Sequence, residues 1–268
     1  MPFPITKLAY GLRCRLAEIT SLTERYNLQV AAGSINICPP QLQPVKAADS
    51  VAFWRDDTGF FVDFSDRDGE LFDNGSLYQI NMILSLIWLN ETDLTAMEII
   101  TVKPIQLVLC RCITTPTFIQ KTASMLRANV KKLTIIEDGD DIPQDIRCKH
   151  PVCLSTVFSS FPNIERLSLD NVLPTSWVPN LEPQQTTKLL RLNLLGTVDS
   201  IRNLNFAEFF KKQPKGFKMR FEICFGDSQS DDTSELEEIL NRYFIRNESD
   251  DSCLTLDLMD RYEYYTLK

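Results

Sequence analysis

The stretch FPNIERLSLDNVLP (Phe161–Pro174) has a short core in which leucines alternate with polar residues. Leu167 and Leu169 are two residues apart, so in a β-strand their side chains point to the same face. Asparagine and proline follow the core, and both residue types are typical of turns. The stretch therefore predicts a short strand with one apolar face, followed by a turn.

The same apolar-x-apolar core recurs from about residue 104 to the end of the chain. Successive cores lie 26, 34, 25, 29 and 35 residues apart, and they are centred on Leu107, Leu133, Leu167, Leu192, Phe221 and Leu256. Helix-like segments alternate with these cores, at Pro116–Val130, Pro151–Ile164, Asn205–Lys212 and Ser234–Phe244. Strands and helices that alternate at this spacing predict right-handed strand–helix units and a mainly parallel sheet.

The stretch quoted first resembles a leucine-rich repeat, in which the strand carries leucine-x-leucine and the following turn carries asparagine. The resemblance implies a leucine-rich-repeat-like α/β domain over residues 104–268. Because the intervals between the cores are irregular, an ordinary open α/β sheet without horseshoe curvature is the alternative.

The polar residues between the leucines predict a binding surface. If Leu167, Leu169, Leu192 and Leu194 face the core, their neighbours along each strand point outward. We expect the target-binding surface on five such residues: Arg166, Ser168, Asp170, Arg191 and Asn193.

The N-terminal stretch FPITKLAYGLRCRLAEITSLTERYNLQVAAG (Phe3–Gly33) has the periodicity of helices. Apolar residues three or four positions apart form one stripe: Ile5, Leu8, Leu12, Leu16 and Ile19. Ser21 and Glu24 then fit a capping box that starts a second helix, and Gly33 is a natural stop. We expect a helical hairpin within residues 1–36.

Residues 37–103 are predicted to contain a linker, a β-hairpin and a helix in turn. ICPPQLQP (Ile37–Pro44) predicts an extended linker, because its prolines forbid a helix. VAFW and FFVDF flank the turn-like residues Asp56–Gly59 and predict a small β-hairpin. The apolar run over Leu77–Leu89 predicts a buried helix, since it is far shorter than the roughly 20 residues that cross a bilayer.

Composition excludes several classes of function. The chain has 268 residues, 44% of them hydrophobic, and a net charge of −8, with no dense cluster of Lys and Arg. We therefore expect a soluble globular protein that binds neither nucleic acid nor membrane. Charged residues such as Lys7 and Arg13 interrupt any secretory signal, so the cysteines are expected to be free thiols in the cytoplasm, with the nucleus as the alternative compartment.

No motif indicates catalysis or a cofactor. Cys148, His150 and Cys153 suggest zinc, but the chain has one histidine and no second ligand pair. Around Asp66 and Asp68 a calcium loop lacks its first ligand, and its last position is a glycine. No phosphate-binding loop, nucleophile elbow or dinucleotide motif is present. We expect no metal, no cofactor and no enzymatic activity; an enzyme with an unrecognised carboxylate site is a third class.

The beginning of the chain resembles the F-box of nematode F-box proteins, in which an F-P-apolar start leads through a leucine-rich helix into a second helix. The positions that match the apolar positions of the motif are Pro4, Leu8, Leu12, Leu16 and Leu22. The resemblance implies that these residues bind a Skp1-like protein and that the chain is a substrate adaptor of a Skp1–cullin ubiquitin ligase, with an unknown protein target. The alternative is a plain leucine-rich-repeat-like binding domain whose hairpin is only a structural cap, because the end of such an array exposes an apolar edge.

Overall fold

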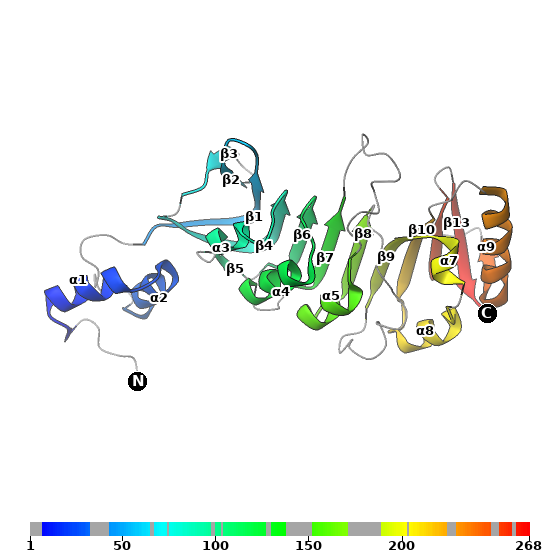
Figure 1. The fold of residues 1–268 in the computed structure, drawn as a ribbon. Helices are drawn as coiled ribbons and strands as arrows, with labels where there is room; N and C mark the ends of the chain where they lie inside the picture. Colours follow the sequence, from blue (N-terminus) through cyan, green and yellow to red (C-terminus); the bar gives the residue numbers. More distant parts are fainter. Residues whose placement is uncertain are drawn as a thin grey trace.

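A computed structural model gives the fold of the chain as a long sheet with helices along one side (Figure 1). The strands it describes form one thirteen-stranded sheet. The described residues are 7–32, 43–64, 67–73, 75–97, 100–102, 104–126, 130–137, 152–170, 189–202, 204–223, 229–247, 252–258 and 261–268.

The centre of the sheet is a run of parallel strands whose spatial order follows the chain. Each strand pairs with the one before it and the one after it, which confirms the prediction of a mainly parallel sheet. The strands are β1 (Val45–Arg55), β4 (Leu77–Ile87), β6 (Gln106–Cys110), β7 (Lys132–Ile136), β8 (Arg166–Asp170), β9 (Arg191–Gly196), β10 (Lys218–Ile223) and β12 (Leu254–Asp257).

Both ends of this run are antiparallel. At one end β1 pairs with β2 (Phe60–Phe64) and β2 pairs with β3 (Arg67–Leu71), which confirms the predicted β-hairpin. Its turn is held by the Asp56 carboxylate, which accepts a hydrogen bond from the Thr58 amide at 2.7 Å. The remaining strands are β13 (Tyr262–Leu267), which joins β12 to the edge strand β11 (Phe244–Asn247), and β5 (Ile100–Val102), which pairs with β4.

The prediction of a buried helix over Leu77–Leu89 is wrong, because β4 occupies this run. Its backbone pairs with β1 on one side and β6 on the other, so the sheet supplies the hydrogen bonds that a helix would make internally. Leu84 and Leu86 are fully buried whereas Ser85 between them is not, which is the alternation of a strand. A short apolar run does not distinguish a buried strand from a buried helix by its composition.

Described helices follow several of the parallel strands, and in Figure 1 α3, α4, α5 and α8 lie along one side of the sheet, as right-handed connections in a constant direction require. Two of them begin at side-chain caps: Thr115 accepts from the Phe118 amide at 3.1 Å, and Asn205 accepts from the Glu208 amide at 3.1 Å. The helices are α3 (Asp93–Ala96), α4 (Pro116–Met125), α5 (Leu154–Ser160), α7 (Val198–Ile201), α8 (Phe206–Lys212) and α9 (Gln229–Tyr243).

The core lies between this helical layer and the sheet. Leu167, Leu169, Leu192 and Leu194 are all at most 3% exposed, which confirms the predicted orientation of these strands. The α4 side chains Phe118 and Ile119 are buried in the same core. The polar residues of the strands therefore lie on the opposite face of the sheet, which we call the open face because none of the described helices covers it.

Two further helices, α1 (Tyr10–Ile19) and α2 (Leu22–Ala32), lie at the N-terminal end, to the left of the sheet in Figure 1. The Gln43 amide donates a hydrogen bond at 2.5 Å to the Gln29 side chain and so links α2 to the start of β1. Of the predicted linker Ile37–Pro44, only Gln43 and Pro44 lie within the described residues.

Candidate protein-interaction surfaces

The open face carries a row of basic residues at the N-terminal ends of four adjacent strands. The strand pairing places the four in register across β7 to β10. Three of the side chains are exposed and the first is half-buried. This basic row consists of Lys132, Arg166, Arg191 and Lys218.

Acidic residues stand at the opposite ends of two of these strands, β8 and β10. Asp170 is the last residue of β8, and Glu222 lies four residues beyond the start of β10. On the next strand, Asp257 is in register with Glu222. Since a strand rises about 3.3 Å per residue, the acidic end of the open face lies about 13 Å from the basic row.

A pocket of about 370 Å³ opens at this acidic end, between β8, β9 and β10. Within it, the Ser168 hydroxyl donates to the Asp170 carboxylate at 2.6 Å, and the Asn193 amide donates to the Ser168 hydroxyl at 3.4 Å. The residues that line it are Ser168, Leu169, Asp170, Asn193, Leu194, Arg220 and Glu222.

Arg220 is held in place beside the pocket. Its guanidinium donates to the Asp257 carboxylate at 2.5 Å and lies 5.2 Å from the centre of the Tyr262 ring. The hydrogen bond to Asp257 raises the pKa of Arg220, so the guanidinium stays charged. The Arg220 charge is therefore matched within the protein, whereas Arg166 and Arg191 have no carboxylate within ion-pair distance among the described residues.

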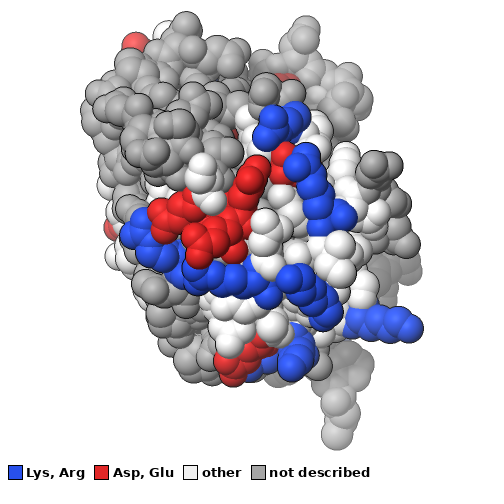
Figure 2. Space-filling view, turned by 90° about the vertical axis from the view of Figure 1, so that its right-hand side faces the viewer, with Lys and Arg blue, Asp and Glu red and all other residues white. Residues whose placement is uncertain are grey.

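The C-terminal end of the sheet is also rich in charge, and there the two signs are mixed. Figure 2 shows acidic side chains gathered beside a band of basic ones at this end. They pair closely: Arg202 with Glu235 at 2.5 Å and Arg242 with Glu238 at 2.7 Å. These paired charges compensate one another. The C-terminal end therefore exerts a weaker electrostatic field on a charged partner than the basic row does.

The five residues predicted to bind a target lie together on the open face. Arg166 is in register with Arg191 in the basic row. The other three line the pocket: Ser168, Asp170 and Asn193.

Sequence reasoning missed the residues that complete this surface on the flanking strands. Lys132 and Lys218 complete the basic row, and Arg220 and Glu222 complete the pocket. One signal was available, because a lysine or arginine directly precedes the first core residue of each of these four strands.

The N-terminal helix pair, α1 and α2, is the second candidate surface. No residue of α1 is buried, although its composition is partly apolar. Leu12 is 59% exposed and Ile19 is 67% exposed, and Val30 on α2 is also exposed. The two helices therefore present apolar side chains to solvent.

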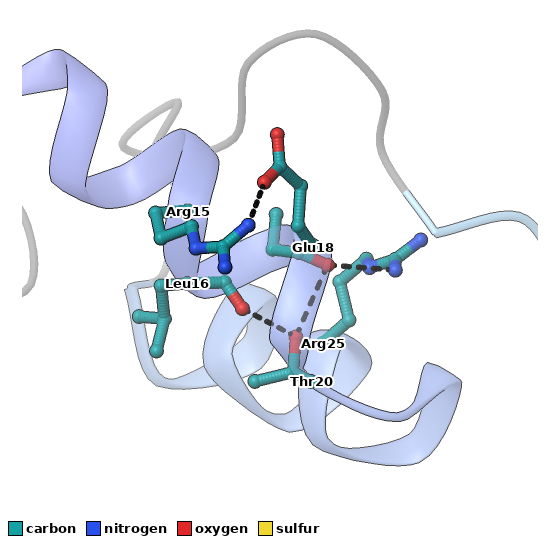
Figure 3. A network of polar contacts seen from close by, with 6 residues as sticks. Arg15, Leu16, Glu18, Thr20 and Arg25 are labelled. Atoms are coloured by element: carbon teal, nitrogen blue, oxygen red, sulfur yellow. Dashed lines mark hydrogen bonds and ion pairs between the residues drawn. The ribbon is translucent and has the colours of Figure 1, made fainter.

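Polar contacts define the junction between α1 and α2 (Figure 3). The Ser21 amide donates to the Glu24 carboxylate at 2.9 Å and the Glu24 amide donates to the Ser21 hydroxyl at 3.3 Å, which confirms the predicted capping box. Across the junction, the Arg25 guanidinium donates to the Ala17 carbonyl at 2.8 Å, and the Thr20 hydroxyl donates to the Leu16 carbonyl at 2.9 Å.

The residues predicted to bind a Skp1-like protein differ in exposure. Leu12 is exposed, whereas Leu8, Leu16 and Leu22 are half-buried. Pro4 lies outside the described residues.

Cys153 is the one member of the predicted zinc motif within the described residues, which exclude Cys148 and His150. Its thiol lies 3.0 Å from the Ser155 hydroxyl. Hydrogen bonds from Ser155 and Thr156 lower the pKa of Cys153 to about 7. Burial, in contrast, raises the pKa of Cys112 to about 12.

These differences predict the order of thiol modification in the native protein. At pH 7 we expect iodoacetamide to label Cys153 at least about 100-fold faster than Cys112, because only the thiolate reacts and Cys112 is buried. The rate at Cys153 should fall as the pH drops below about 7, where its thiolate becomes protonated. Peptide mass spectrometry over time measures both rates. Ser155→Ala should slow labelling of Cys153 at pH 7, and equal labelling of the two cysteines would contradict the assignment.

Two kinds of site are absent from the described ranges: a helix that could span a membrane and a cluster that could hold a metal ion. Among the described helices, none combines the length and the apolar character that crossing a lipid bilayer requires. Within the same residues, no three His, Cys, Asp or Glu side chains are grouped so that they could hold a metal ion. Comparison of the chain with known protein families, with curated proteins and with solved structures finds no match.

Proposed function

We propose that this protein is a non-enzymatic interaction module, an F-box-type substrate adaptor for a Skp1–cullin ubiquitin ligase. In this proposal α1 and α2 form a divergent F-box hairpin that binds a Skp1-like protein. The strand–helix units form a leucine-rich-repeat-like domain, and its open face binds the protein target. The proposal places the protein in the cytoplasm or the nucleus.

The observation that carries the proposal is the exposure of apolar side chains on a helix pair that stands beside the sheet (Figure 1). A helix that only capped the core would bury its apolar stripe, but no residue of α1 is buried. An amphipathic helix of this kind is suited to dock its exposed stripe in a groove of a partner.

The second candidate is a plain leucine-rich-repeat-like binding domain whose hairpin is a structural cap. The hydrogen bond between Gln29 and Gln43 favours it, because this bond ties α2 to the first strand. The two candidates differ in what the exposed residues of α1 do, and a single substitution separates them.

We expect Leu12→Asp to weaken binding to a Skp1-like protein at least about tenfold, because a charge would enter an apolar contact. Biolayer interferometry with the purified chain measures the affinity, and circular dichroism monitors the fold. The melting temperature should stay nearly unchanged, since Leu12 is mostly exposed.

Leu71→Asp is the matched control, because Leu71 on β3 is also a mostly exposed leucine. This variant should bind the Skp1-like protein as the wild type does. Absence of wild-type binding, together with unfolding of the Leu12→Asp variant, would favour the structural cap and reject the adaptor.

A further inference from the structure

We infer that the N-terminal half of the open face docks an amphipathic helix of the protein target, a helix that carries an acidic residue beside its apolar stripe. The inference rests on the proposed function, since it names the chemistry of the partner that the open face would bind. The docking surface lies on β2, β1, β4, β6 and β7, and it includes none of the residues that line the pocket between β8, β9 and β10.

Five apolar side chains form a continuous row on this part of the open face. Strand pairing places each of them beside the next one on the neighbouring strand. All five are half-buried. On β1, β4, β6 and β7 the residue just before the row is buried in the core, so the row points to the opposite side of the sheet. This apolar row consists of Phe61, Trp54, Ile87, Cys110 and Ile136.

The apolar row has defined ends. At one end the Trp54 and Phe61 rings stack, with their centres 4.4 Å apart. At the other end Ile136 is in register with Asp170, where the face becomes charged. Five neighbouring strands span about 19 Å, so the row is a contiguous apolar strip that none of the described helices covers. Such a strip is typical of a site that docks a partner.

Two residues with left-handed backbone flank the row. Trp88 directly follows Ile87, and Arg111 directly follows Cys110, with φ of 56° and 52°. Bulky L-residues rarely adopt this conformation, and strained residues of this kind cluster at binding sites. Their amides donate to the carbonyls of Cys110 at 3.0 Å and Ile136 at 2.8 Å, so the strand ladder holds both residues in place.

The side chains of Trp88 and Arg111 stand together beside the row. The Arg111 guanidinium carbon lies 5.6 Å from the centre of the Trp88 ring, and Trp88 is 48% exposed. Arg111 is exposed and forms no ion pair among the described residues, whereas Arg55, which directly follows Trp54, pairs with Asp93 at 2.7 Å. An acidic side chain on the flank of a docked helix would meet a guanidinium that the ring already orients.

The direction and spacing of the row fit a helix. The row crosses the strands, and neighbouring strands are about 4.8 Å apart. A helix laid along the row presents an apolar side chain at each turn, about every 5.4 Å. An extended segment laid the same way presents one about every 6.7 Å, and a segment parallel to the strands crosses the row only once. A helix of about 14 residues covers the whole row.

Charge disfavours two other occupants. The exposed apolar stripe of α1 in a second copy of this chain carries Arg13 and Arg15 against one acidic residue, Glu18, so it is unsuited to a surface flanked by Arg111. A bilayer with anionic lipids is repelled by the net charge of −8. An apolar helix stripe with an acidic flank matches both the row and Arg111.

The test uses three fluorescein-labelled helical peptides and the full chain, with binding followed by fluorescence polarisation. The first peptide consists of alanine and glutamine with four leucines spaced four, three and four positions apart, and a glutamate follows the third leucine. The second has lysine in place of the glutamate, and the third has the composition of the first with its leucines distributed around the helix. We expect the first peptide to bind at least about fivefold more tightly than either of the others. Equal affinities would overturn the inference.

Substitution in the row identifies the surface. Ile87→Thr combined with Ile136→Thr should weaken binding of the first peptide at least about tenfold, because apolar contact is lost while threonine keeps the preference for a strand. Ile245→Thr on β11 is the matched control at an exposed isoleucine and should change the affinity less than about twofold. Circular dichroism monitors folding, and Trp88→Ala replaces the double variant if that variant unfolds. An unchanged affinity in a folded variant would overturn the inference.

A charge swap tests the flank with a gain of binding. Arg111→Glu should reverse the preference, so that the peptide with lysine binds more tightly than the peptide with glutamate. Lys121→Glu, at an exposed lysine on α4, is the matched control and should leave the preference as it is in the wild type. A preference that stays the same in Arg111→Glu would reject Arg111 as the partner of the acidic residue and overturn the inference.

The same variants test the other occupants and the proposed function. A dimer in sedimentation, or binding to vesicles of phosphatidylserine and phosphatidylcholine, would overturn the inference if it is lost in the Ile87→Thr and Ile136→Thr double variant. Binding of the Skp1-like protein separates the two proposals. Its absence in a chain that selects the first peptide would reject the adaptor alone, and its presence in a chain without peptide selectivity would reject the docked helix alone.

Discussion

Replacing Leu192 with alanine is expected to lower the free energy of unfolding by about 3 kcal/mol. Leu192 is fully buried near the start of β9, and its register neighbours are Leu167 on β8 and Met219 on β10, both also buried. Truncation of the side chain removes buried apolar surface and leaves a cavity between two strands and the helical layer. The surrounding strands are hydrogen-bonded on both sides, so they collapse little into that cavity.

Leu190→Ala is the matched control, because this leucine stands just before β9 and is 37% exposed. This substitution should lower the free energy of unfolding by less than about 1 kcal/mol. Urea unfolding monitored by circular dichroism measures both values, with equal slopes expected for the two variants. Equal costs would mean that the leucines of β9 do not face the core as described.

Stability and binding are separated by the alternation of residues along each strand. On β9, Leu192 and Leu194 face the core, whereas Arg191 and Asn193 face the opposite side. A substitution at Arg191 can therefore change what the open face binds without opening a cavity.

The parallel sheet and its apolar face were predictable because both depend on local signals. The leucine-x-leucine cores mark the strands, and their period of two fixes which residues share a face. The capping box at Ser21 and Glu24 was predictable for the same reason, since its two residues are three positions apart.

The charge pattern of the open face was not predictable at the same level, because it depends on register between strands that are far apart in the chain. Lys132 and Lys218 belong to one row only because β7, β8, β9 and β10 are paired without a shift at their first residues. A shift of one residue on any strand would move its basic side chain to the core face.

Two strands, β4 and β13, illustrate other limits of the sequence. In β4 the apolar run is short and interrupted, so composition alone fits a helix as well as a strand. In β13 the segment YEYYTL is rich in aromatic residues that favour strands, and it was missed because it lacks the leucine-x-leucine core.

Glu263→Ala on β13 is expected to destabilise the protein by about 3 kcal/mol, the second large effect. The side chain of Glu263 is 2% exposed, and its carboxylate accepts from Arg246 at 2.8 Å and from Arg261 at 3.0 Å. It also accepts at 2.7 Å from the Tyr265 hydroxyl. Burial raises the pKa of Tyr265 above its usual range, so this hydroxyl stays protonated and needs an acceptor.

Removal of the carboxylate leaves the buried Tyr265 hydroxyl without its acceptor and removes the anion shared by two guanidinium groups. Glu263→Gln should lower the free energy of unfolding by less, about 1 kcal/mol, because the amide oxygen of glutamine still accepts a hydrogen bond. Arg261→Ala should also cost less than about 1 kcal/mol, since the Arg261 side chain is 54% exposed and is solvated when unpaired.

Glu208→Ala is the matched control for Glu263→Ala. Glu208 is an exposed glutamate on α8 that pairs with Lys212 at 3.5 Å, so its loss should cost only about 0.3 kcal/mol. Chemical unfolding of the four variants in one buffer at pH 7 measures the series. If Glu263→Ala costs no more than Glu208→Ala, Glu263 does not organise the end of the sheet. If the predicted order holds, one buried carboxylate holds β13 between β12 and β11, where none of the described parallel strands continues the array.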